Sequence, residues 1–192
     1  MSPDEKYNAA VSASRYTNAV LSKGPANGPF NAMKAVLLES IGHKLEAELD
    51  RDAVRERYPK VLTADGKAFV LNFYMFSEIE KWAKKIKTGN CGEFSIVAFQ
   101  SLINVQNVET PVELLRAKNH WLVILNRNSA TPLKSPDLWN EDAIVCDAWR
   151  NKADYIGKFL NNVTRFTAIE SLRMPDDNPG GYLLVPHNWK SW

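Results

Sequence analysis

A cysteine stands between two glycines at the point where a polar segment gives way to an apolar one. Residues 88–93 read TGNCGE, and residues 94–99 are apolar apart from one serine. This pattern predicts a loop that enters a buried helix with Cys91 in its first turn, where the helix dipole and unpaired N–H groups favour the nucleophilic thiolate. Gly89 and Gly92 leave room for a substrate carbonyl to approach. A small, inert core cysteine is the other interpretation, and this segment alone does not decide between the two.

A histidine and an aspartate further along the chain could activate this thiol. His120 opens one apolar strand, and Asp147 closes another. If the two strands are antiparallel neighbours, the start of one lies beside the end of the other, and the two side chains become cross-strand partners. A nucleophilic thiol needs a base, and the base needs a third group to orient it. The sequence therefore predicts a catalytic site made of Cys91, His120 and Asp147.

Each of these residues also has a structural explanation. His120 could bond a backbone group at a strand edge, and Asp147 could cap the turn that follows it. His187 is a rival base, although no comparably placed acid follows it. Alternation along the strand turns Cys146 away from the face of Asp147, so we expect Cys146 in the core.

Apolar periodicity and turn residues predict helices in the first part of the chain and mainly strands afterwards. This order is typical of an α+β domain. We expect an N-terminal helical extension over residues 1–60 and a core over residues 61–192, joined in one compact unit. Helices are predicted at 4–22, 30–57, 78–87 (opened by a capping box at Ser77) and 91–104; strands at 112–116, 119–125, 143–147, 163–166 and 182–185; either type at 69–76; and a surface loop beside the site at 126–142.

Composition excludes several classes of function. The 192 residues carry 24 basic and 22 acidic side chains, a net charge of +2 with no basic block, so nucleic acid is not an expected partner. The N-terminus lacks a signal-peptide pattern, and no apolar run is long enough for a membrane span. The two cysteines are expected to be free thiols in a reducing cytosol. The three histidines are scattered and no metal-binding motif occurs, so we expect neither a metal nor a cofactor.

Three stretches together resemble the papain-like and transglutaminase-like cysteine enzymes, and most of all the bacterial secreted effectors and toxins of that group. The family's usual strand ending, aspartate-proline-tryptophan, is Asp147-Ala148-Trp149 in this chain. The likeness covers residues 78–190 and rests on segments 90–93, 119–124 and 144–149.

The resemblance implies a papain-like/transglutaminase-like core, in which a central helix packs on an antiparallel sheet. By the same resemblance, Cys91 is the nucleophile, His120 the general base and acid, and Asp147 the orienting group. It also implies a cytoplasmic enzyme, or an effector delivered into a host cytosol by a specialised secretion system, acting on a protein substrate such as a host protein.

The chain departs from the papain-like pattern at the oxyanion site. Many of those enzymes use an upstream glutamine as oxyanion donor, but this chain has no glutamine before Gln100. The Cys91 N–H would need help from Asn90, Asn72 or another N–H, and one missing donor costs about a hundredfold or more in rate. Further candidates for oxyanion or substrate binding are Gly92, Trp121 and Trp149.

The predicted triad supports three reactions that share a thioester intermediate: glutamine deamidation, transglutamination and proteolysis. The effector-like resemblance favours the two glutamine-directed reactions, with a papain-like cysteine protease as the alternative. An alternative of another class is a non-catalytic protein-binding module, in which the tryptophans serve a partner. The sequence leaves open the substrate, the oligomeric state and the role of residues 1–60.

Overall fold

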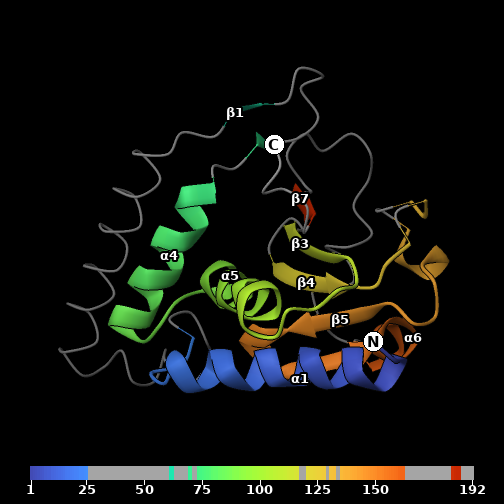
Figure 1. Ribbon diagram of the computed structural model, residues 1–192, viewed down its shortest axis with the longest axis horizontal. Helices are drawn as coiled ribbons and strands as arrows, with labels where there is room; N and C mark the ends of the chain where they lie inside the picture. The colour runs from blue at the N-terminus through green and yellow to red at the C-terminus, as the bar shows by residue number, and fades with distance from the viewer. Residues whose placement is uncertain are drawn as a thin grey trace.

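An antiparallel sheet with helices packed against it forms the fold of this chain (Figure 1). The computed structural model describes residues 1–25, 61–62, 69–70, 73–116, 120–128, 130–132, 135–162 and 183–186. Its helices are α1 (Pro3–Val20), α4 (Phe73–Ile86), α5 (Cys91–Gln100) and α6 (Ile156–Asn162), with a π-helix at Ser101–Val105 and 3-10 turns at Pro136–Leu138 and Ala148–Arg150. Its strands are β1 (Val61–Leu62), β2 (Phe69–Val70), β3 (Val112–Arg116), β4 (Trp121–Leu125), β5 (Ile144–Asp147), β6 (Lys152–Tyr155) and β7 (Leu183–Pro186).

Five strands make the main sheet in the order β6-β5-β4-β3-β7, and all neighbours run antiparallel. Strands β1 and β2 pair separately as a short hairpin. Between β4 and β5, Val123 lies opposite Cys146 and Leu125 opposite Ile144. The start of β4 and the end of β5 therefore lie side by side, as the sequence predicted. The edge of the sheet formed by these strand ends carries the predicted site residues.

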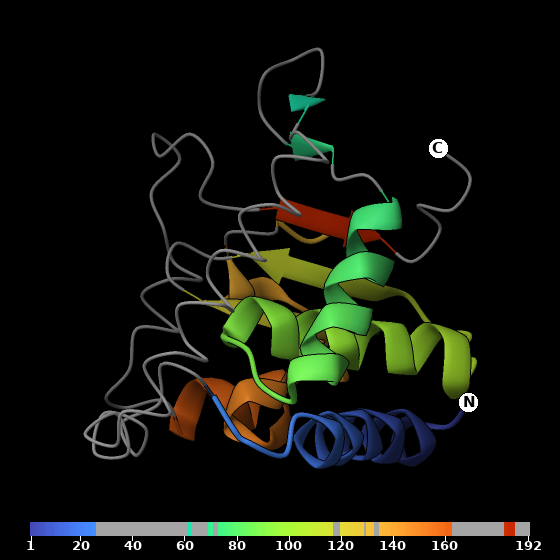
Figure 2. The ribbon, with the colours of Figure 1, turned by 90° about the vertical axis from the view of Figure 1, so that its left-hand side faces the viewer.

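Side chains that alternate along the strands divide between two hydrophobic clusters. Val123 and Cys146 pack on one face of the sheet with α5 and α1, whereas Ile124 and Val145 pack on the other face with α6. Helix α5 lies between α4 and the sheet, and α1 crosses beneath it (Figures 1 and 2). Every residue from Glu93 to Gln100 is buried, as expected for a central helix that is apolar on all sides.

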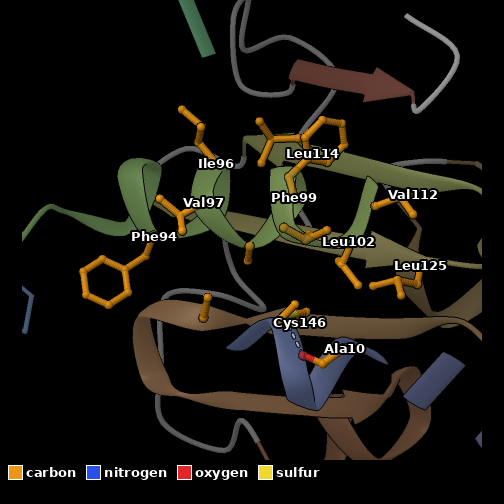
Figure 3. Close-up of a cluster of buried hydrophobic side chains, with 14 of the residues drawn as sticks. Ala10, Phe94, Ile96, Val97, Phe99, Leu102, Val112, Leu114, Leu125 and Cys146 are labelled. Carbon is orange, nitrogen blue, oxygen red and sulfur yellow. Dashed lines mark hydrogen bonds between the residues drawn. The ribbon is translucent and has the colours of Figure 1, made fainter. Parts of the chain in front are cut away.

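The core around α5 also holds the second cysteine (Figure 3). Cys146 is fully buried, and its thiol donates to the Ala10 carbonyl of α1 at 3.5 Å. The prediction that Cys146 belongs to the core is confirmed. Because Ala9, Ala10 and Ala13 are buried in the same cluster, α1 is part of the core that carries the sheet.

Most of the predicted elements are confirmed within the part of the chain that the structure describes. The α+β class, α1, the start of α5, and strands β3, β4, β5 and β7 agree with the sequence patterns. The predicted helix at 30–57 and strand at 163–166 lie outside the described residues.

Two predictions were wrong. Helix α4 begins at Phe73, so Ser77 lies inside it and opens no helix. The fully buried Phe76 lies on the same face as Ile79 and Ala83. Burial of this apolar stripe extends the helix toward the N-terminus, beyond Ser77. The insert 126–142 does not lie beside the predicted site, because antiparallel pairing carries it to the opposite edge of the sheet.

Strand β6 and helix α6 were not predicted, because polar residues interrupt both. In the described part of the chain, no helix is both long and apolar enough to cross a bilayer.

Candidate active site

Cys91 is the first residue of α5 and is half-buried. The chain enters this helix in an extended conformation at Asn90. The Glu93 carboxylate accepts a hydrogen bond from the Asn90 N–H at 2.6 Å and so holds the entering loop to the first turn. Gly89 is required here for another reason than substrate access, because a β-carbon at this position would lie 2.5 Å from the Glu93 Cβ.

The first turn of α5 is tied to the start of β4. The Ser95 hydroxyl donates to the Trp121 carbonyl at 2.8 Å. A β-carbon added to Gly92 would meet the Trp121 indole nitrogen at 3.6 Å, an ordinary contact distance. These contacts bring Cys91 to the sheet edge at which β4 starts and β5 ends.

His120 and Asp147 meet at that edge. The His120 Nε2 lies 3.0 Å from the Asp147 Oδ2, and both residues are buried, at 7% and 1% exposure. The Cys91 side chain lies close enough to His120 to raise the pKa of the ring. Because Nε2 is engaged with the carboxylate, Nδ1 is the ring nitrogen left for the thiol. The structure therefore brings the three predicted residues together from a helix start, a strand start and a strand end.

The electrostatics of the site favour a charged imidazole. Burial by itself lowers the pKa of His120, but the hydrogen bonds to Asp147 and Cys91, together with the charges of both groups, raise it to about 9. Below that pH the ring carries a proton beside the sulfur. A cationic partner of this kind favours the thiolate form of a cysteine.

A tight turn holds the Asp147 carboxylate. Its Oδ1 accepts from the Arg150 N–H at 3.3 Å, and its Oδ2 lies 3.6 Å from the Arg150 Nε. Asp147 thus caps the 3-10 turn and contacts His120 at the same time. Helix α1 braces this turn, because the Asn18 side chain donates to the Ala148 carbonyl at 2.8 Å.

Two half-buried tryptophans flank the site. Trp121 lies beside Gly92, and the Trp149 ring meets the His120 ring edge-on at 5.6 Å between centroids. The Arg150 guanidinium lies over the Trp149 ring at 5.9 Å. Trp149 thus covers part of the His120 ring, and Trp121 lies at the first turn of α5.

The structure describes some of the residues predicted to bind an oxyanion and not others. The Asn90 N–H donates to the Glu93 carboxylate, whereas the Cys91 N–H lies at the helix start, where N–H groups have no partner within the helix. Asn72 and the rival base His187 lie outside the described residues. Among the residues described, no group of three His, Cys, Asp or Glu side chains is placed to hold a metal ion.

Sequence reasoning missed four residues that position the site. Glu93 and Ser95 fix the start of α5, Arg150 contacts Asp147, and Asn18 holds the turn after it. An aspartate can cap a turn by accepting a hydrogen bond from the backbone N–H three residues later, and Asp147 and Arg150 have this spacing. Asn18 lies 130 residues before its partner and has no local signal.

Comparison of the chain with protein-family models, curated proteins and solved structures found no match.

Proposed function

We propose that the protein is a thiol-dependent acyl-transfer enzyme with a papain-like/transglutaminase-like core, in which Cys91 is the nucleophile. One observation carries the proposal: the His120 Nε2 lies 3.0 Å from the Asp147 carboxylate, and Cys91 lies close enough to the same ring to raise its pKa. A nucleophile, a base and a group that orients the base are the minimum set for this chemistry. A buried structural histidine would explain the Asp147 contact but not the half-buried thiol on its other side.

The first half of the proposed reaction forms a thioester. The Cys91 sulfur attacks a carboxamide carbon, and the negative charge moves to the carbonyl oxygen. The His120 imidazolium then gives its proton to the nitrogen, the C–N bond breaks, and the amine or ammonia leaves. Asp147 stabilises the imidazolium and fixes the orientation of the ring.

The second half of the reaction releases the acyl group. Neutral His120 takes a proton from water or from a primary amine, which attacks the thioester carbon. The C–S bond breaks, and the thiolate and imidazolium are restored. Water acting on a glutamine thioester gives glutamate, an amine gives an isopeptide, and water acting on a peptide thioester completes proteolysis.

We propose glutamine side chains of a protein as the substrate, either deamidated or transferred to an amine. This choice rests on the resemblance of the segments around Cys91, His120 and Asp147 to bacterial effectors that act on host proteins inside a host cytosol. Half-buried Trp121 and Trp149 would line the approach to the thiol. Proteolysis is the alternative that the experiments must separate.

The first test measures how fast iodoacetamide alkylates Cys91 between pH 4 and 10. The Cys146→Ser background leaves one thiol and keeps a donor for the Ala10 carbonyl. We expect alkylation to persist at acidic pH, well below the range of about 8.5 for an ordinary thiol, and to lose this persistence in His120→Ala. An unreactive Cys91, or a profile that His120→Ala leaves unchanged, would overturn the proposal.

The second test treats lysates with the enzyme and with Cys91→Ala and compares peptides by mass spectrometry. Deamidation adds about one mass unit to a glutamine, transglutamination adds the mass of an amine, and proteolysis creates new termini. Modifications made only by the unsubstituted protein identify the reaction. New termini without modified glutamines would replace the proposed substrate class with peptide bonds.

A further inference from the structure

Arg150 brings a second cation to the carboxylate that orients His120. Its backbone N–H donates to Asp147 Oδ1 at 3.3 Å, and its Nε lies 3.6 Å from Oδ2. Oδ2 is also the oxygen that lies 3.0 Å from the His120 Nε2. A turn cap needs only the backbone bond, so the position of the guanidinium is an additional feature.

Burial makes this second charge important. Asp147 is 1% exposed, and a buried carboxylate is costly unless a cation or several donors compensate it. In the proposed reaction His120 is neutral for part of each cycle and then no longer compensates the carboxylate. A guanidinium keeps its charge at every working pH.

The other ionisable groups around Asp147 do not supply that charge in the described part of the chain. Cys146 precedes it in β5, and burial together with the charge of Asp147 raises the pKa of this thiol, which keeps it neutral. Lys152 lies opposite Asp147 in β6, but it is exposed to solvent. A thiol such as Cys91 carries no positive charge in either protonation state.

We propose that Arg150 is a positioning residue that acts through Asp147: its guanidinium is the fixed counter-charge of the carboxylate and weakens the hold of the carboxylate on the His120 proton. The inference rests on the proposed function, because only a histidine that gives and takes protons needs such a balance. A general acid that binds its proton too tightly transfers it poorly. The guanidinium also lies over the Trp149 ring, 5.9 Å from its centroid.

The test compares Arg150→Gln with Arg150→Lys by NMR titration of the His120 ring. Both variants keep the backbone N–H that bonds Oδ1, so the orientation of the carboxylate is retained, and both lose the guanidinium over Trp149, but only Arg150→Lys keeps a positive charge. We expect Arg150→Gln to raise the pKa of His120 by about one unit, because a nearby positive charge is lost. Arg150→Lys should leave it within about 0.3 units of the original.

An unchanged or lowered value in Arg150→Gln would overturn the inference, since a merely structural residue would loosen Asp147 and lower the pKa. The amide spectrum of each variant checks that the fold is intact. Alkylation of Cys91 in the unsubstituted protein separates the two failures. A reactive Cys91 with no shift in Arg150→Gln removes only the role of Arg150, whereas an unreactive Cys91 removes the proposed function.

Discussion

Burial and charge act in opposite directions on the pKa of His120. Burial disfavours the imidazolium, whereas Asp147 and Cys91 favour it, and the balance raises the pKa of the ring to about 9. Asp147→Asn removes the main opposing charge and keeps the shape of the side chain. We expect the pKa of His120 in this variant to fall below its ordinary value of about 6.5, because burial then dominates.

NMR titration of the histidine ring protons would measure this shift, with His120→Gln used to assign the signal. We expect a value near 9 in the unsubstituted protein and a drop of more than about 2.5 units in Asp147→Asn, because the buried ion pair is lost. An Asp147→Asn value that stays near 9 would show that the carboxylate is not the group that charges the ring.

The two cysteines should differ sharply in reactivity. Cys146 is fully buried, and burial together with the charge of Asp147 raises the pKa of its thiol, whereas Cys91 is half-buried at a helix start. We expect iodoacetamide to add one group to the native protein, on Cys91, and two after denaturation in urea. Intact-mass and peptide mass spectrometry would count and locate the adducts. Labelling of Cys146 in the native protein would contradict the packing around α1.

At the scale of elements, the start of α5 depends on a glycine outside the helix. Gly89→Ala would bring a β-carbon within 2.5 Å of the Glu93 Cβ, so Glu93 must move and its bond to the Asn90 N–H is strained. We expect a loss of about 1–3 kcal/mol in the free energy of unfolding, the range for forced overpacking, and slower alkylation of Cys91.

Gly157→Ala is the matched control for that substitution. Gly157 lies in α6, and an added β-carbon there meets nothing within 4 Å. Alanine is the better helix former, so we expect Gly157→Ala to stabilise the protein by up to about 1 kcal/mol. Urea unfolding of both variants would measure the difference. Equal effects of the two substitutions would contradict a specific role for Gly89.

Helix α1 reaches the site through Asn18. Its side-chain amide donates to the Ala148 carbonyl at 2.8 Å, directly after Asp147. Asn18→Ala should remove this brace, cost about 1 kcal/mol of stability and lower the alkylation rate of Cys91 at acidic pH. Asn8→Ala makes the same change at an exposed position of α1 and should alter neither quantity. A loss of stability with an unchanged alkylation profile would confine Asn18 to the fold.

The elements that sequence predicted well are those whose burial pattern is local. Short, β-rich apolar runs identified β4 and β5, and a longer apolar run identified α5, because each pattern needs only neighbouring residues. Side chains alternate between the two faces of a strand, so Cys146 and Asp147 lie on opposite faces of β5. Antiparallel pairing of β4 with β5 then brought His120 to Asp147, which made the candidate triad predictable.

What sequence could not supply depends on contacts between distant segments. Nothing near Asn18 shows that it holds the turn after Asp147, because the partner lies 130 residues away. The insert 126–142 was wrongly predicted to lie beside the site. Antiparallel pairing of β4 with β5 places it at the opposite ends of these two strands. The predicted start of α4 was wrong because the capping signal at Ser77 involves only neighbouring residues. The burial of Phe76, which extends the helix, depends on contacts in the packed core.

At the scale of the whole molecule, a buried ion pair lies at the edge of the sheet opposite the candidate site. Arg127 Nε lies 2.7 Å from Glu113 Oε2, a second guanidinium nitrogen lies 2.9 Å from Oε1, and both side chains are buried. The guanidinium also donates to the Thr131 carbonyl at 2.7 Å and lies over the Trp139 ring. The pair thus anchors the insert to β3.

Arg127→Ala should therefore cost about 3–5 kcal/mol, because it leaves Glu113 as an unpaired buried carboxylate. Replacing both residues, as Arg127→Met with Glu113→Leu, should recover much of that loss, since no buried charge then remains. Lys158→Ala removes an exposed lysine from its pair with the half-buried Asp154 and should change stability by less than about 1 kcal/mol. Urea unfolding measures all three variants. Alkylation of Cys91 in the folded fraction should match the unsubstituted protein throughout, because the pair and the candidate site lie at opposite edges of the sheet. A variant that loses both stability and Cys91 reactivity while still folded would instead show that the two edges are coupled through β4.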